Sequence, residues 1–250
     1  WRWWQDELAR WETGCDDLLP LLRLERTAGI GVDGRLALVL AGLVEEDSRF
    51  GTVFARLQAP LPGRRPSVEL IGQVARGRED AALDAAVLAR RLLDLGLVET
   101  VNPDAARAEW ALRVPGEVWD ALRGDLPGRG AGWAYHPPDE FPAIADLVLP
   151  EPFVRRLEQA PAVLSAGKAH ALVVRGTAGS DRLRIAGAAA RALGRGVILV
   201  DGAALAGRPD RSLGPLCSLV GALPAISYDL GPGETAQPPD LAAYDGPVIV

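Results

Sequence analysis

Residues 176–183 are the segment whose residue types and spacing come nearest to a ligand-binding or catalytic motif. They follow the apolar run Ala171–Val174 and precede the alanine-rich run Arg184–Leu193. A strand, a loop with glycines and a helix, in that order, gather backbone N–H groups and a helix N-terminus around a phosphate. The candidate phosphate-binding residues are Gly176, Thr177, Ala178, Gly179, Ser180, Asp181, Arg182 and Leu183.

This loop lacks the side chains that act in the phosphate-binding pattern G-x-x-x-x-G-K-[ST]. Asp181 replaces the second glycine, Arg182 the lysine, and Leu183 the hydroxyl that holds Mg²⁺. A carboxylate at the helix N-terminus repels phosphates, and a leucine cannot bind a metal. The sequence therefore predicts a degenerate site without catalysis. Because Arg182 keeps a positive charge, weak ATP binding through that residue is the alternative hypothesis.

A second strand gives an independent check of the same site. The apolar run Ala225–Tyr228 is followed by Asp229, the position that assists Mg²⁺ in an intact site, and then by Leu230. A hydrolysing site needs a glutamate after the aspartate to polarise water, and here that residue is leucine. Asp229 is therefore predicted to be a vestigial metal-site position, and we assign no metal ligand.

Other residue types give no catalytic or metal-binding pattern. The two histidines, His136 and His170, have no nucleophile or acid at motif spacing. Cys15 and Cys217 lie far apart, as expected of reduced thiols in a cytosolic protein. We assign no catalytic residue in this chain.

The composition is that of a soluble globular protein, since 48% of the 250 residues are hydrophobic and 24% are charged. The sequence has no membrane-spanning apolar run and no cleavable leader, so we expect a cytoplasmic protein without membrane contact. The chain has no methionine, begins with Trp1 and stops in the strand-like run Pro247–Val250. We therefore expect it to be a piece of a longer protein.

Residues 1–122 are predicted to form an N-terminal helix and a mostly helical domain. Asp33 and Ser67 are candidate helix caps. Alternating apolar residues at 97–101 and 110–114 flank an Asn-Pro-Asp turn and predict a two-stranded ribbon. Short helices followed by a hairpin are typical of a winged helix.

The remaining residues are predicted to be a linker and an α/β module. Residues 123–146 are rich in glycine and proline and lack a sustained apolar period, as in an interdomain linker. Residues 147–250 alternate strand and helix, which indicates a parallel sheet. The predicted strands are Ala171–Val174, Val197–Val200, Ala225–Tyr228 and Pro247–Val250, and the predicted helices are Pro152–Gln159, Arg184–Leu193 and Gly214–Leu223.

Charge argues against nucleic acid as a partner, although winged helices often bind DNA or RNA. Residues 1–150 carry 17 Arg and no Lys against 24 acidic residues, a net charge of −7. A duplex-binding face needs several cations to neutralise phosphates. A protein client or adaptor is the expected partner of the winged helix, and a nucleic-acid binder is the competing hypothesis.

Taken together, these segments resemble a family of bacterial AAA+ ATPases that carry an N-terminal winged-helix domain, a degenerate first AAA module and an active second module. The resemblance rests on residues 42–51, 54–58, 64–68, 95–97, 148–150, 173–183, 200–202 and 225–229. It implies an α/β chain made of a mostly helical winged-helix domain followed by a partial P-loop module with a parallel sheet. It also implies that the strand at 247–250 lies between the P-loop strand and the Asp229 strand.

The same resemblance implies what the chain does. We expect a non-hydrolysing regulatory or partner-binding region that is not itself an enzyme and holds no cofactor. ATP and Mg²⁺ would be bound in the full-length parent, whose active module would follow residue 250. That downstream module is then a further partner, within the same chain.

Overall fold

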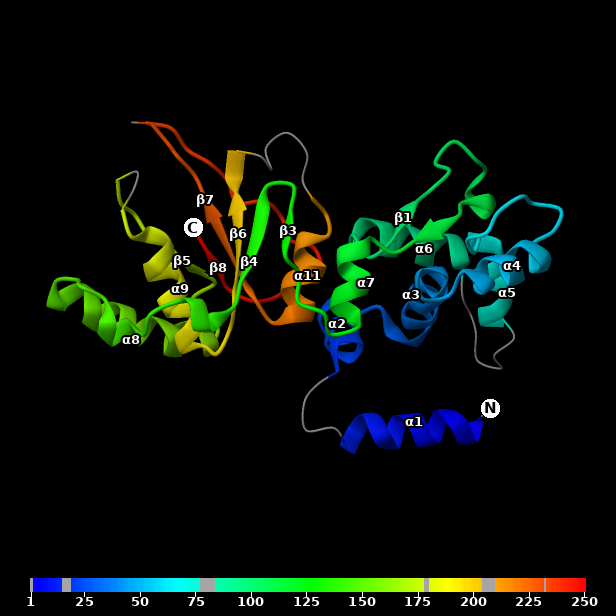
Figure 1. The fold of residues 1–250 in the computed structure, drawn as a ribbon, viewed down its shortest axis with the longest axis horizontal. Helices are drawn as coiled ribbons and strands as arrows, with labels where there is room; N and C mark the ends of the chain where they lie inside the picture. Colours follow the sequence, from blue (N-terminus) through cyan, green and yellow to red (C-terminus); the bar gives the residue numbers. More distant parts are fainter. Residues whose placement is uncertain (1, 15–18, 77–83, 178–179, 204–209, 232) are drawn as a thin grey trace. The chain divides into compact units, whose positions relative to one another are not determined.

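The computed structural model describes residues 2–14, 19–76, 84–177, 180–203, 210–231 and 233–250. The chain is of the α/β class and divides into two compact units, Trp1–Gly124 and Asp125–Val250 (Figure 1). Ala178 and Gly179 of the candidate loop lie outside the described residues. No helix in the described ranges is long and apolar enough to cross a membrane.

Unit 1 is mostly helical. Its elements are α1 (Arg2–Gly14), α2 (Pro20–Ala28), α3 (Gly31–Glu46), α4 (Ser48–Leu57), α5 (Val68–Arg76), α6 (Ala85–Asp94), β1 (Glu99–Thr100), the 3-10 turn Arg107–Glu109, β2 (Leu112–Arg113) and α7 (Gly116–Leu122). The strands β1 and β2 pair antiparallel, so the predicted ribbon forms. Its ladder is extended by a bridge between Ser67 and Ala111.

Side-chain caps begin three of these helices. Asp47 accepts a hydrogen bond from the backbone N–H of Arg49 at the start of α4, and Asp84 accepts two at the start of α6. The predicted cap Ser67 accepts from the N–H of Leu70 with its Oγ at 3.2 Å. The prediction for Asp33 is wrong, because α3 begins at Gly31 and encloses Asp33 in its first turn.

Unit 2 is built on one mixed sheet. Its elements are β3 (Arg129–Gly130), β4 (Trp133–His136), the 3-10 turns Pro138–Glu140 and Ile144–Asp146, α8 (Glu151–Ser165), β5 (Ala171–Leu172), α9 (Arg182–Ala192), β6 (Val197–Asp201), α11 (Leu213–Val220), β7 (Leu223–Ser227) and β8 (Val248–Ile249). The strand order is β3-β4-β6-β7-β8-β5. Strands β5 to β8 pair in parallel, as predicted for this part of the chain.

The position of the last strand is confirmed, because β8 lies between β5 and β7. The boundaries of all three predicted helices differ from prediction. The first, predicted as Pro152–Gln159, is longer and ends at Ser165 in α8. The third predicted helix ends at Val220 because Gly221 takes a left-handed conformation at φ 65°, which favours glycine. The second begins at Arg182, so Arg182 and Leu183 belong to the first turn of α9.

The prediction of a linker over residues 123–146 is wrong at residues 129–136, which join the sheet. Trp133–His136 form β4 and pair antiparallel with the whole of Val197–Val200 in β6. Arg129 and Gly130 pair with β4 in turn. The glycines and prolines of this segment suggested a linker, but they lie around a hairpin whose backbone groups form hydrogen bonds with the sheet. Trp133 is buried, and its indole Nε1–H donates to Asp210 at 3.0 Å.

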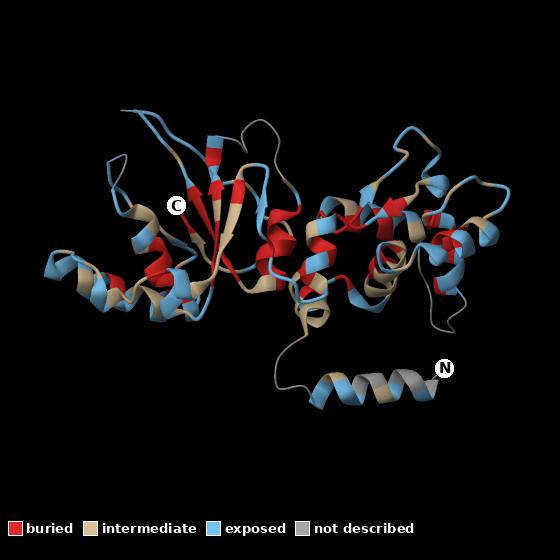
Figure 2. Cartoon of the chain, in the orientation of Figure 1, coloured by how far each residue is buried: buried red, intermediate tan, exposed pale blue. Residues whose placement is uncertain are grey.

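A buried cluster joins α9 to the sheet and forms part of the core of unit 2 (Figure 2). Its members are Phe141, Ala186, Ala190, Val197, Leu223, Ala225 and Ile249. Small residues on α9 allow the helix to lie close to its neighbours. A Cβ on Gly187 would lie 1.9 Å from Cδ1 of Phe141. The guanidinium of Arg191 donates a hydrogen bond to the carbonyl of the same phenylalanine.

We predict that Gly187→Ala lowers the free energy of unfolding by about 1–3 kcal/mol, because the new methyl group overlaps the buried Phe141 ring. This loss outweighs the roughly 1 kcal/mol by which alanine favours a helix over glycine. Urea unfolding followed by far-ultraviolet circular dichroism measures the change. Gly128→Ala is the control in the same unit, since nothing lies within 4 Å of its added Cβ. Equal stability of both variants would contradict the tight contact.

Candidate functional site

The candidate loop leaves the sheet at the carboxyl end of β5. The backbone N–H of Val174 still donates to the carbonyl of Val250 at 2.7 Å, so pairing with the β8 segment continues to this point. Gly176 and Thr177 follow, and Ser180 and Asp181 lead into α9. The predicted order of strand, loop and helix is therefore present.

Hydrogen bonds within the loop occupy backbone groups that a phosphate would otherwise contact. The N–H of Ser180 donates to the carbonyl of Thr177 at 3.0 Å, and the N–H of Arg182 donates to the carbonyl of Ser180 at 2.8 Å. Gly176 lies against the same serine, because a Cβ there would be 2.4 Å from Ser180 Oγ. The N–H groups of Ser180 and Arg182 are thus already engaged within the described part of the loop.

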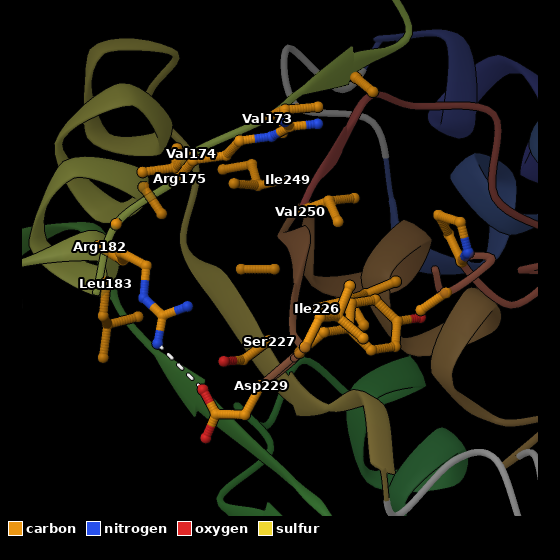
Figure 3. Close-up of a pocket in the computed structure, with 18 of the residues that line it drawn as sticks. Val173, Val174, Arg175, Arg182, Leu183, Ile226, Ser227, Asp229, Ile249 and Val250 are labelled. Atoms are coloured by element: carbon orange, nitrogen blue, oxygen red, sulfur yellow. Dashed lines mark hydrogen bonds and ion pairs between the residues drawn. The ribbon is translucent and has the colours of Figure 1, made fainter. Parts of the chain in front are cut away.

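Arg182 and Asp229, which line the same pocket, form an ion pair (Figure 3). Nη2 of Arg182 lies 3.3 Å from Oδ1 of Asp229, although the residues are 47 positions apart in the chain. Asp229 follows the end of β7, and its side chain is 83% exposed, whereas that of Arg182 is 28% exposed. The residue at the lysine position and the residue at the magnesium position therefore neutralise each other.

Asp181 and Leu183 take different roles from those of an intact loop. The Asp181 carboxylate is directed to Arg184, with 3.7 Å between the charged atoms, and both side chains are more than half exposed. Leu183 packs against the buried cluster beneath α9. The position that would hold the metal-binding hydroxyl is thus occupied by a hydrophobic contact.

A cavity of about 1080 Å³ lies beside this ion pair. Much of its wall is apolar and comes from α9 and from the strands, including Val174, Leu183, Leu199, Ile226, Ile249 and Val250 (Figure 3). Polar lining groups include Thr177, Arg175, Ser227 and Asp229.

Sequence reasoning missed the segment that follows Leu230. Glu234, Thr235 and Pro238 also line the cavity. Glu234 accepts a hydrogen bond from the N–H of Gly231 at 2.7 Å, which makes its carboxylate part of a local turn. No pattern in this proline- and glycine-containing stretch marks it as part of a site.

Tyr228 also lines the cavity, and its hydroxyl donates a hydrogen bond to the carbonyl of Gln237 at 3.1 Å. Burial raises the pKa of the Tyr228 hydroxyl above its ordinary value. The neutral phenol is therefore the form present near neutral pH, and it ties the end of β7 to the segment that follows Leu230.

These residues do not fit a magnesium-bound triphosphate. Arg182, at the position of the P-loop lysine, is paired with Asp229, and Leu183 offers no oxygen to a metal. Within the described ranges, no group of three or more His, Cys, Asp or Glu side chains could hold a metal ion. Nδ1 of His136 lies at hydrogen-bond distance, 2.8 Å, from Oε2 of Glu140, and neither residue lines the cavity.

Comparison with protein-family models, with curated proteins and with solved structures found no match to this chain. The geometry of the loop, the ion pair and the sheet is therefore the basis for assigning a function.

We predict a coupling energy of at most about 1 kcal/mol between Arg182 and Asp229, because Asp229 is mostly in water. A double-mutant cycle with Arg182→Gln, Asp229→Asn and the double variant, followed by urea unfolding, measures it. A coupling above about 2 kcal/mol would show that the pair is a structural support of unit 2 and not a charge-neutralising contact at its surface.

Proposed function

We propose that this chain is the N-terminal, non-hydrolysing region of a cytoplasmic AAA+ ATPase. Unit 1 would be a winged-helix domain that recognises a client or adaptor protein. Unit 2 would be a degenerate first AAA module that acts as a scaffold or regulator, with hydrolysis performed by a module later in the parent chain.

The observation that carries the proposal is the sheet order together with the ion pair. In the order β6-β7-β8-β5, the strand before the loop is separated from the Asp229 strand by one strand, as the resemblance implies. This arrangement brings Arg182 and Asp229 to the same edge of the sheet, at the positions where lysine and Mg²⁺ act in an active site. The side chains at these two positions form an ion pair with each other, which supports a module that does not hydrolyse ATP.

The helices and ribbon of unit 1 support the winged-helix part of the proposal. The bridge between Ser67 and Ala111 places a short extended segment before α5 beside the β1–β2 ribbon. The chain therefore runs from this segment through α5 and α6 and then into the ribbon. In a winged helix, helices are followed by a hairpin, and a short extended segment from earlier in the domain pairs with that hairpin. The Ser67 segment has this position beside the β1–β2 ribbon.

Arginines on α6 and the ribbon favour a protein partner over a nucleic acid. Arg90 pairs with Asp94 at 3.5 Å, and Arg113 pairs with Glu99 at 2.7 Å. Arg91 donates to the carbonyl of Gly29 at 2.7 Å, beyond the end of α2. Because these cations already have partners within unit 1, they are poorly placed to neutralise phosphates.

We predict that the chain does not bind Mg-ATP at millimolar nucleotide, because Arg182 is engaged and no metal-binding hydroxyl is present. Isothermal titration calorimetry and thermal shift would both show no change. Binding with a Kd below about 1 mM that is lost in Arg182→Ala would contradict the proposal and support weak ATP binding through Arg182. The triple variant Asp181→Gly, Arg182→Lys, Leu183→Thr restores the loop pattern and serves as the comparison.

We predict no complex with duplex DNA or RNA at low salt, where electrostatic binding is strongest. An electrophoretic mobility shift assay with mixed-sequence duplexes, at chain concentrations up to about 10 µM, tests this expectation against typical non-specific affinities. A shift that weakens on adding salt and on changing Arg113 to Ala would instead favour the nucleic-acid hypothesis for unit 1.

A further inference from the structure

The cavity at the carboxyl ends of β5 to β8 has a row of apolar side chains at its base. Leu199, Ala225 and Ile249 are register partners on the neighbouring strands β6, β7 and β8, and all three line the cavity. Register partners in a parallel sheet share one face, so these side chains form a single row across the sheet. Val174 continues the row just beyond β5, and Leu183 in the first turn of α9 packs against the same face.

Much of this apolar lining is open to solvent. Val174, Leu183 and Leu199 pack against the buried cluster of unit 2, yet they are only partly buried themselves. Val173 and Leu230, which also line the cavity, are 57% and 50% exposed. Ligand pockets in proteins are mostly apolar, with a few polar groups, and have volumes of about 300–1,000 Å³. The cavity, with its volume of about 1080 Å³, therefore has the walls and the size of a site for a small apolar ligand.

The charged side chains that line the cavity differ in whether they have partners. Arg182 pairs with Asp229, and Glu234 accepts a hydrogen bond from the N–H of Gly231. The side chain of Arg175 is exposed and has no hydrogen bond or ion pair within the described residues. Arg175 directly follows the last residue of the apolar row. A positive charge that can meet a ligand therefore lies at one end of an apolar surface.

The width of the sheet sets the length of a ligand that would cover the row. Adjacent strands lie about 4.8 Å apart, so the row from β6 to β5 crosses three spacings, or about 14 Å. An extended polypeptide spans at most about 3.6 Å per residue, which is about 1.2 Å for each backbone atom. An extended chain of about twelve atoms therefore matches the row.

We propose that this cavity binds an unbranched fatty acid of about twelve carbons, with its acyl chain along the row and its carboxylate at Arg175. Removal of the methylene groups from water would supply most of the affinity. The guanidinium can donate two parallel hydrogen bonds to the carboxylate. The binding requires only the geometry of unit 2, and it does not depend on the function proposed for the chain.

Isothermal titration calorimetry of the full chain with sodium octanoate, decanoate and dodecanoate tests the site. We expect a single fatty acid to bind to each chain, with a Kd for dodecanoate below about 1 mM. Each added methylene should lower the Kd about two- to fourfold, because each is removed from water on binding. Far-ultraviolet circular dichroism with and without dodecanoate verifies that the chain stays folded.

Two variants address the acyl chain and the carboxylate separately. Ser227 lines the cavity two residues after Ala225, so its side chain lies on the face of the apolar row (Figure 3). Ser227→Trp should fill the cavity and raise the Kd for dodecanoate at least about tenfold. Arg175→Gln should raise it about three- to fivefold, as expected for an exposed ion pair. The matched controls are Ser165→Trp and Arg156→Gln, which change exposed residues of α8 that do not line the cavity.

The proposal is overturned if dodecanoate does not bind at about 1 mM, or if the Kd does not depend on the length of the acyl chain. Binding that Ser227→Trp leaves unchanged would also overturn it, because the ligand would then lie outside the cavity. An unchanged Kd in Arg175→Gln would contradict the position of the carboxylate. Binding of several molecules to each chain would likewise count against the site, since a denaturing amphiphile binds in that way.

Discussion

Insertion of β8 between β5 and β7 is the interaction on which the candidate site depends. The N–H groups of Val248 and Val250 donate to the carbonyls of His170 and Leu172, and the N–H of Val174 donates back to Val250. On its other side β8 pairs with β7. Parallel pairing sets the carboxyl ends of these strands at one edge, so the loop after β5 and the aspartate after β7 meet. The Arg182–Asp229 ion pair follows from this backbone pairing.

The features of unit 2 that depend on local pattern could be predicted from the sequence. Apolar runs located its four parallel strands, and glycines located the loop, whereas the helix end that Gly221 sets on α11 was not predicted. The hairpin at residues 129–136 could not be predicted in this way, because its pairing with β6 joins segments some 60 residues apart. The direction of the Asp181 carboxylate likewise depends on Arg184, one turn further along α9, and on how far that helix extends. Tertiary pairing and helix boundaries therefore account for the differences.

Several of the described arginines hold the chain's own structure. Arg91 bonds to carbonyls beyond the end of α2, Arg191 to the carbonyl of Phe141, and Arg182 to Asp229. The planar guanidinium suits this purpose because it presents several donors at once. A count of basic residues consequently overstates the positive charge available to a ligand.

The β3–β4 hairpin also bears on how the two units can be separated from one another. The backbone of β6 is hydrogen-bonded to β4 on one side and to β7 on the other. A fragment that began at residue 147 would expose an unpaired β6 edge and remove Trp133 from Asp210, leaving a template for aggregation. A cut between Gly124 and Asp125 preserves both sides of β6. Residues 129–136, whose composition is that of a linker, are thus part of the sheet. The boundary between the two units lies before them, at Gly124 and Asp125.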